Sequence, residues 1–214
     1  WHERNDFKNI TKIEKLEEIP FLPSAIFKHL SLKSEYSSNK QLQSSGTTSQ
    51  FRSKIFLDSH TSLNQTKSLT KILKFFLGKK KSAFFIVDIE PKNSQNDDGT
   101  IAARFAGMSG YLLAAKSKTY LLEESKTGEI VLKKHALEKL IEASHNGQVV
   151  VIGYTYMIWQ HLLDNNKNHV NLNLGINTRL IHFGGWKKLG DLKITKKTLL
   201  SEMNATLNLA SRNV

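Results

Sequence analysis

The chain has 214 residues, with 31 Lys and Arg against 19 Asp and Glu, a formal net charge of +12, and no cysteine. The missing cysteine excludes a disulfide framework, a thiolate zinc site and a cysteine nucleophile within these residues. A hydrophobic content of 39% is typical of a globular chain and excludes a disordered one. A cysteine-free sequence also fits a reducing compartment, so we expect a cytoplasmic protein.

The positive charge suggests nucleic-acid binding, because Lys and Arg neutralise phosphates. Its distribution argues against that function. Only five of the basic residues are arginine, which base and bidentate phosphate recognition favour, and the lysines are scattered. The densest run, residues 79–81, follows an apolar stretch and a glycine, as at a helix end. We therefore expect no nucleic-acid partner. We also expect no membrane span, since the longest apolar stretch, residues 149–159, is shorter than the ~20 residues that a span needs.

The first quarter of the chain predicts few regular elements. Residues 1–33 read as a helical and irregular lead-in to one domain over residues 1–214, with a short amphipathic helix at 11–19 that prolines end. Residues 34–50 are rich in Ser, Thr, Asn and Gln, which indicates a loop. Residues 54–58 then predict a strand.

The rest of the chain alternates between helical and extended patterns. Two continuous apolar runs predict strands buried on both faces, and two shorter runs predict further strands. The predicted strands are 83–89, 119–122, 149–153 and 179–183. The predicted helices are 62–77, 101–115, 137–146, 154–163 and 195–209. This alternation predicts an α/β fold with a largely parallel sheet flanked by helices.

The most informative segment is the polar stretch directly before the strand at 54–58. Residues 44–50 read SSGTTSQ, and their hydroxyls and the backbone N–H groups around Gly46 can donate to a phosphate. Arg52 and Lys54 place cations beside these donors. The stretch lacks the Gly-Lys-Ser/Thr ending of a Walker loop. Taken alone, it is more simply read as a flexible polar loop.

In its context the stretch resembles a known family. Residues 44–58, SSGTTSQFRSKIFLD, are similar to the phosphate loop of adenylate-forming enzymes, most closely that of the LuxE-type acyl-protein synthetases of bacterial luminescence. Three more segments follow that family in order and spacing: IPFLPSAIFK at 19–28, GYTYMIWQHL at 153–162 and LIHFGGWKKL at 180–189. Phenylacetate–coenzyme A ligases are more distant relatives. Four segments in register are far more specific than the loop alone.

The resemblance implies a ligase that uses ATP and Mg²⁺ to convert a fatty acid, or another carboxylic acid, to an acyl adenylate and passes the acyl group to a protein thiol. Acyl-transferase and reductase subunits are the partners it implies. It implies that the phosphates are bound by Ser44, Ser45, Gly46, Thr47, Thr48 and Ser49. Catalytic charge stabilisation is the role it implies for Thr47, Thr48 and Arg52. On the adenine side of the nucleotide, it implies Gly184, Gly185 and Trp186. It assigns no metal ligand. For the glycine pair, a plain strand-to-loop turn is the alternative interpretation.

The chain also departs from the family pattern. Ser49 stands where the family loop ends in glycine, and Phe183 replaces the first glycine of a Gly-Gly-Gly-Trp sequence. Serine at a position with φ above zero would strain the turn. Several segments that the family carries further along are not present: the Tyr-Gly-x-x-Glu segment, the ribose-binding aspartate, the C-terminal lysine and the acyl-accepting cysteine. We therefore expect the N-terminal part of such an enzyme.

Other residues that attract attention have simpler interpretations. The segment 154–163 is apolar on nearly every side, which indicates core, although the resemblance places it beside the acyl channel. Its Tyr154, Trp159 and His161 are then packing residues. His60, His135 and the remaining histidines show no metal-ligand spacing.

Two other functions remain open. A truncated or degenerate family member could serve as a non-catalytic nucleotide- or protein-binding module, and an ATP titration of stability discriminates this from an inert chain. A basic nucleic-acid binder is the third possibility, and it predicts DNA affinity that falls steeply with salt.

Overall fold

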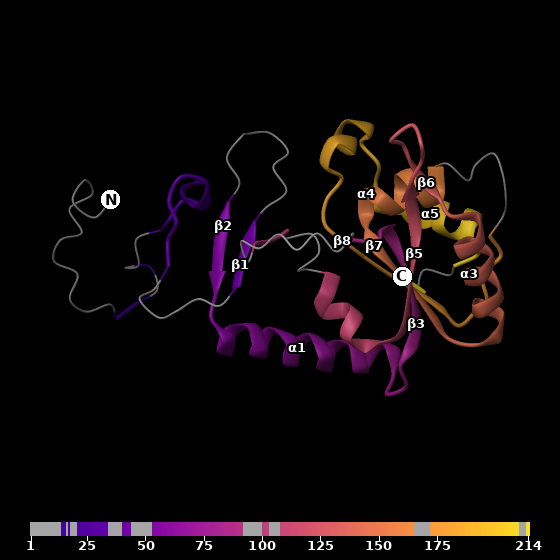
Figure 1. Cartoon of the computed structure of the whole chain (residues 1–214), viewed down its shortest axis with the longest axis horizontal. Helices are drawn as coiled ribbons and strands as arrows, with labels where there is room; N and C mark the ends of the chain where they lie inside the picture. The colour runs from indigo at the N-terminus through magenta and orange to yellow at the C-terminus, as the bar shows by residue number, and fades with distance from the viewer. Residues whose placement is uncertain are drawn as a thin grey trace.

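The computed structural model describes residues 14–15, 17, 21–33, 40–43, 53–91, 100–102, 108–164, 172–209 and 213–214. The smaller of two sheets has the strand order β2-β1-β4 and contains Lys40–Gln43 (β1), Lys54–Leu57 (β2) and Thr100–Ala102 (β4). β1 is antiparallel to β2 and parallel to β4. Figure 1 shows this sheet to one side of the larger one, with a long helix running below and between them.

The larger sheet has five strands in the order β6-β5-β3-β7-β8. They are Ser82–Ile89 (β3), Ala115–Glu124 (β5), Ile130–Leu132 (β6), Val149–Tyr154 (β7) and Thr178–Phe183 (β8). β5, β3, β7 and β8 are parallel, and only the edge strand β6 is antiparallel. The predicted α/β class with a largely parallel sheet is therefore confirmed. The two continuous apolar runs are the neighbouring inner strands β3 and β7, because only inner strands are covered on both faces.

The helices lie on both faces of this sheet. The α-helices are Ser59–Leu77 (α1), Lys134–Asn146 (α3), Thr155–Met157 (α4) and Lys196–Leu207 (α5), with one helical turn at residues 108–111. A π-helix, Ile158–Asp164 (η5), continues α4 directly. Within the described ranges, the 3₁₀ helices are Ser24–Lys28 (η3), Leu112–Ala114 (η4) and Lys187–Leu192 (η6).

α1 has both of its ends capped by the residues that flank it. The Asp58 carboxylate accepts hydrogen bonds from the Thr61 backbone N–H at 2.8 Å and the Thr61 hydroxyl at 2.6 Å. These bonds, especially the one from the hydroxyl, lower the pKa of Asp58. At the other end Gly78 has φ +83°, a conformation that glycine adopts without strain. The predicted end of this helix at Gly78 is confirmed.

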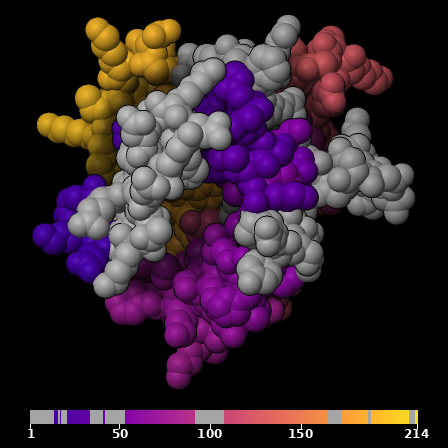
Figure 2. Space-filling model, turned by 90° about the vertical axis from the view of Figure 1, so that its left-hand side faces the viewer, coloured from indigo at the N-terminus to yellow at the C-terminus, as the bar shows by residue number. Residues whose placement is uncertain are grey.

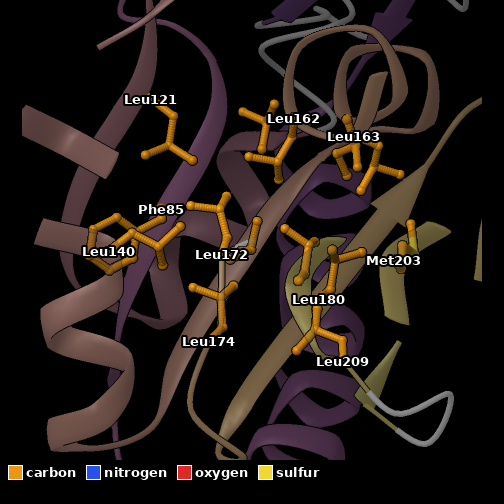
Figure 3. Packing of buried hydrophobic residues seen from close by; sticks show 14 of the residues in the cluster. Phe85, Leu121, Leu140, Leu162, Leu163, Leu172, Leu174, Leu180, Met203 and Leu209 are labelled. Carbon is orange, nitrogen blue, oxygen red and sulfur yellow. The ribbon is translucent and has the colours of Figure 1, made fainter. Parts of the chain in front are cut away.

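Two apolar clusters fill the space between the sheet and its helices. On one face, Leu73 and Leu77 of α1 pack with Phe84, Ile86 and other residues of the inner strands. On the opposite face, α3, η5 and α5 cover the sheet. Figure 3 shows leucines from η5, from β8 and from residues 172–174 gathered beside Phe85 and Leu140. The sheet is thus the middle of three layers.

Two predictions about local structure were wrong. Residues 34–50 were predicted as loop, but β1 lies within them; its sequence KQLQ has one apolar residue and becomes a strand through backbone pairing with β2 and β4. Residues 101–115 were predicted as one helix. Among the described residues of that range, 101–102 belong to β4, 108–111 are helical, 112–114 are a 3₁₀ turn and Ala115 begins β5.

Two other predictions needed correction in extent. The strand predicted at 119–122 is the ten-residue β5, because its polar first half pairs with β3 along a register that local hydrophobicity does not show. The single helix predicted at 154–163 is α4 followed by the π-helix η5. Five of the seven η5 side chains are buried, so the segment is core as predicted. The helix predicted at 11–19 lies largely outside the described residues.

None of the described helices combines the length and the apolar character that a bilayer crossing requires. Figure 2 shows the side of the molecule that carries the smaller sheet, with the side chains of α1 forming its lower part in magenta. Several apolar side chains of α1 are exposed, Phe75 most of all, with 83% of its surface accessible.

Candidate functional site

The carboxyl ends of β3 and β7 form the point of the larger sheet where a ligand is expected. The chain leaving β3 reaches residues 108–114 on the α1 face, because Met108 and Leu112 pack with Leu73 and Leu77. The chain leaving β7 enters α4 and η5 on the opposite face, since Met157 packs in the other cluster. In open α/β sheets, ligands bind at the carboxyl ends of two adjacent parallel strands whose connections depart to opposite faces.

The predicted adenine-side residues lie at this same edge of the sheet, directly after β8. Gly184 has φ +77°, and a Cβ placed on it would lie 2.9 Å from Cδ1 of Tyr154. A Cβ on Gly185 would meet no atom within 4 Å. The half-buried indole of Trp186 packs edge-on against Trp159, with the ring centroids 5.7 Å apart. Gly184 thus has a backbone conformation that requires glycine, whereas the space beside the backbone of Gly185 is open.

A buried threonine hydroxyl ties this turn to the start of the helix after β7. Thr155 is 3% exposed, and its Oγ1 lies 3.1 Å from the carbonyl oxygen of Gly184 and 3.2 Å from that of Phe183. The same Oγ1 lies 3.0 Å from Nδ1 of His182. The carboxyl ends of β7 and β8 are therefore joined by side-chain hydrogen bonds in addition to the sheet ladder.

Aromatic rings line the α1 side of the same edge. Tyr111 stacks on Phe183 with ring centroids 5.3 Å apart and planes 10° from parallel. Tyr154 meets Phe183 edge-on at 4.6 Å. The ring of Phe183 is thus held between two tyrosines beside the glycine turn.

Acidic and histidine side chains set the electrostatics of this end of the sheet. Asp88 near the end of β3 is fully buried, and its Oδ1 accepts from the Ile89 backbone N–H at 2.8 Å. Burial, with the charges of Glu90 and Asp88, raises the pKa of Tyr120 on the neighbouring strand. Burial, with the charge of Lys196, lowers the pKa of His182, so its imidazole stays neutral near pH 7.

His161 is a second histidine whose imidazole is kept neutral. It lies in η5 with 5% of its surface exposed, and burial lowers its pKa. Within the described part of the chain its Nδ1 has no hydrogen-bond partner. No group of three or more His, Asp and Glu side chains that could hold a metal ion occurs among those same residues.

A separate apolar cavity of about 440 Å³ lies between α1 and the outer side of β8. Its apolar walls include Ile72, Phe76 and Ile181, and its charged or polar lining residues are Tyr111, Arg179, His182 and Asn213. Nη1 of Arg179 donates to the Asn213 side-chain oxygen at 2.8 Å. The cavity reaches His182 but not the glycine turn two residues further on.

The predicted phosphate-binding residues cannot be placed in this geometry. Residues 44–49 and Arg52 lie outside the described residues. The strands on either side are described: β1 ends at Gln43, which pairs with Lys54 at the start of β2. The role of the loop therefore stays a prediction, as does that of Gly184, Gly185 and Trp186, although the last three do lie together at the carboxyl edge.

The comparison with protein families shows which family the chain belongs to. A family model described as acyl-protein synthetase, LuxE, matches residues 3–214. The chain belongs to the LuxE family. Among curated proteins and among solved structures, none matches it significantly. The LuxE-type relationship predicted from the sequence is thereby confirmed, and the family suggests a ligase-type enzyme, an acyl-protein synthetase.

Sequence reasoning missed the residues that organise the turn of this LuxE-family chain. Thr155 was passed over, and His182 was considered only as a metal ligand. A usable signal was present: Thr155 directly follows a buried parallel strand, and residues at that position face the edge where ligands bind. Tyr111 gave no comparable signal, because its partner Phe183 is 72 positions away.

Proposed function

We propose that the protein activates a long-chain fatty acid with ATP and passes the acyl group to a protein thiol. A carboxylate oxygen of the acid bonds to the α-phosphorus, and pyrophosphate leaves with the electrons of the broken P–O bond. A thiolate sulfur then takes the acyl group, and AMP leaves. The observation that carries this proposal is the LuxE family match over residues 3–214.

The geometry of the glycine turn supports nucleotide binding. A planar base needs close approach to backbone, and the open space where a Cβ on Gly185 would stand permits it. The turn also lies at the edge of the sheet where nucleotides bind in open α/β folds. We assign the adenine side to Gly184, Gly185 and Trp186.

We assign the phosphates to the hydroxyl-rich loop at residues 44–49 and to Arg52. Hydroxyl and backbone N–H donors, with a guanidinium, stabilise the charge that develops as pyrophosphate leaves. Thr47, Thr48 and Arg52 are the proposed catalytic residues. Mg²⁺, when bound to the phosphates, would neutralise part of their charge, and we assign it no protein ligand.

ATP–pyrophosphate exchange tests the proposal directly. The assay is run on the protein of the complete reading frame with fatty acids of increasing length, and we expect exchange that depends on the acid. Thr48→Ala is expected to lower the rate by about 10²- to 10³-fold if the hydroxyl stabilises the transition state. Absence of exchange with every carboxylic acid would refute adenylation, and ATP-dependent stabilisation in that case would indicate a binding module.

A further inference from the structure

Only one arrangement lets the Thr155 hydroxyl form hydrogen bonds with both a carbonyl oxygen and His182. It has one proton, so it donates to a carbonyl oxygen, that of Gly184 or that of Phe183, at 3.1 and 3.2 Å. The lone pairs that remain face Nδ1 of His182 at 3.0 Å. Nδ1 must therefore carry the imidazole proton and donate it, which leaves Nε2 as the acceptor nitrogen.

This arrangement fixes three consecutive residues relative to the helix that follows β7. His182 donates through its side chain, and Phe183 and Gly184 accept through their carbonyl groups. Beyond them, Gly185 has no near contact for a Cβ. Gly184 and Gly185 are both exposed, so the backbone that a ligand can approach begins at the last residue whose carbonyl group Thr155 holds.

We propose that Thr155, oriented by His182, is the positioning residue that holds the glycine turn in the conformation that accepts the nucleotide. The inference rests on the proposed function, because it concerns the nucleotide side of that site. Thr155 makes no contact with the reacting atoms in this role. Its removal should weaken ATP recognition and leave recognition of the fatty acid unchanged.

Paired variants of Thr155 separate the effect of its hydroxyl from the effect of the size and shape of its side chain. Thr155→Val removes the hydroxyl at nearly constant volume, and Thr155→Ser keeps it. The control is Thr178→Val on β8: Thr178 is also fully buried, and its hydroxyl has no hydrogen-bond partner among the described residues. His182→Asn keeps a side-chain N–H near the position of Nδ1, whereas His182→Leu does not.

The assay is ATP–pyrophosphate exchange with KM determined separately for ATP and for the fatty acid. We expect Thr155→Val to raise the KM for ATP by about three- to ten-fold, the effect of one hydrogen bond, with the fatty acid KM unchanged. Thr155→Ser and Thr178→Val should stay within about two-fold of the wild type. If Thr155→Val does not fold, the His182→Leu and His182→Asn pair makes the same comparison.

The outcomes distinguish the two proposals. An active wild type with an unchanged ATP KM in both Thr155→Val and His182→Leu overturns the positioning role and leaves the proposed function standing. Equal increases in both KM values, or an equal effect of Thr178→Val, also overturn it, because they indicate general destabilisation. A wild type without exchange refutes the proposed function, and the positioning role with it.

Discussion

Replacing Gly184 with alanine should damage the fold at one defined point. The residue has φ +77°, in the left-handed region that side chains disfavour. The new Cβ would also lie 2.9 Å from Cδ1 and 3.4 Å from Cε1 of Tyr154. That ring cannot move away freely, because it packs edge-on against Phe183 at 4.6 Å.

The two effects set the size of the change. Backbone strain of a non-glycine residue at positive φ costs about 1–3 kcal/mol, and forcing an extra carbon into a packed site costs about 1–3 kcal/mol. We expect Gly184→Ala to lower the free energy of unfolding by about 2–6 kcal/mol. For a chain of this length that corresponds to a Tm lower by about 5–15 °C.

Gly185→Ala is the matched control. It adds the same carbon to the adjacent glycine, whose φ lies outside the left-handed region and whose Cβ would meet nothing within 4 Å. Its stability should stay within about 1 kcal/mol of the wild type. Both variants are unfolded in urea and by heat, followed by far-UV circular dichroism. Equal midpoints for Gly184→Ala and Gly185→Ala would refute the reasoning.

Three further changes test other parts of the fold. Leu162→Ala, at a fully buried position of η5, should lower the free energy of unfolding in urea by about 2–5 kcal/mol. Its control, Leu113→Ala at a position 56% exposed, should lower it by under about 0.5 kcal/mol. Similar losses in the two variants would contradict the packing described for Leu162. Thr195→Ala removes the side chain that accepts from the Thr198 N–H at 3.1 Å at the start of α5, and should cost about 0.5–2 kcal/mol, with a smaller loss in Thr195→Ser. Burial lowers the pKa of His161 from 6.5 in the folded protein, so the unfolded chain binds a proton at this imidazole more tightly. The stability that neutral His161 contributes is therefore present above pH 6.5 and is lost as the pH falls through the lowered pKa of the folded state. The urea midpoint should therefore drop between pH 7.5 and 5.5, and drop less in His161→Phe; an equal drop in both would contradict this assignment.

Elements with a strong local pattern were predicted well. β3 and β7 are continuous apolar runs, and α1 has a periodic apolar face with an end marked by Gly78. In these segments the local pattern and the tertiary environment agree, since both faces of the inner strands are covered. The order of the strands was not predicted, because β3 pairs with β7 about 65 residues later in the chain.

The polar strand β1 and the hydrogen bonds around Thr155 could not be predicted from the sequence. β1 has the sequence KQLQ, and its strand form depends on partners from two other parts of the chain. Likewise, Thr155 and His182 are 27 positions apart and are brought together by the pairing of β7 with β8. Such contacts follow from topology and not from local preference. The glycine pair was found because the family resemblance marked it.

The way α1 is held has a mechanical consequence. Its buried residues, Leu73 and Leu77, are both in the last two turns, while Leu63 near its start is 51% exposed. The helix is thus a rod of 19 residues, about 28 Å long, fixed to the larger sheet at one end and joined to β2 at the other. A tilt of about 10° at the fixed end would carry the far end through about 5 Å. A small rearrangement of the packing around Leu73 and Leu77 that tilted the helix would therefore produce a larger displacement at the strand that follows the proposed phosphate loop.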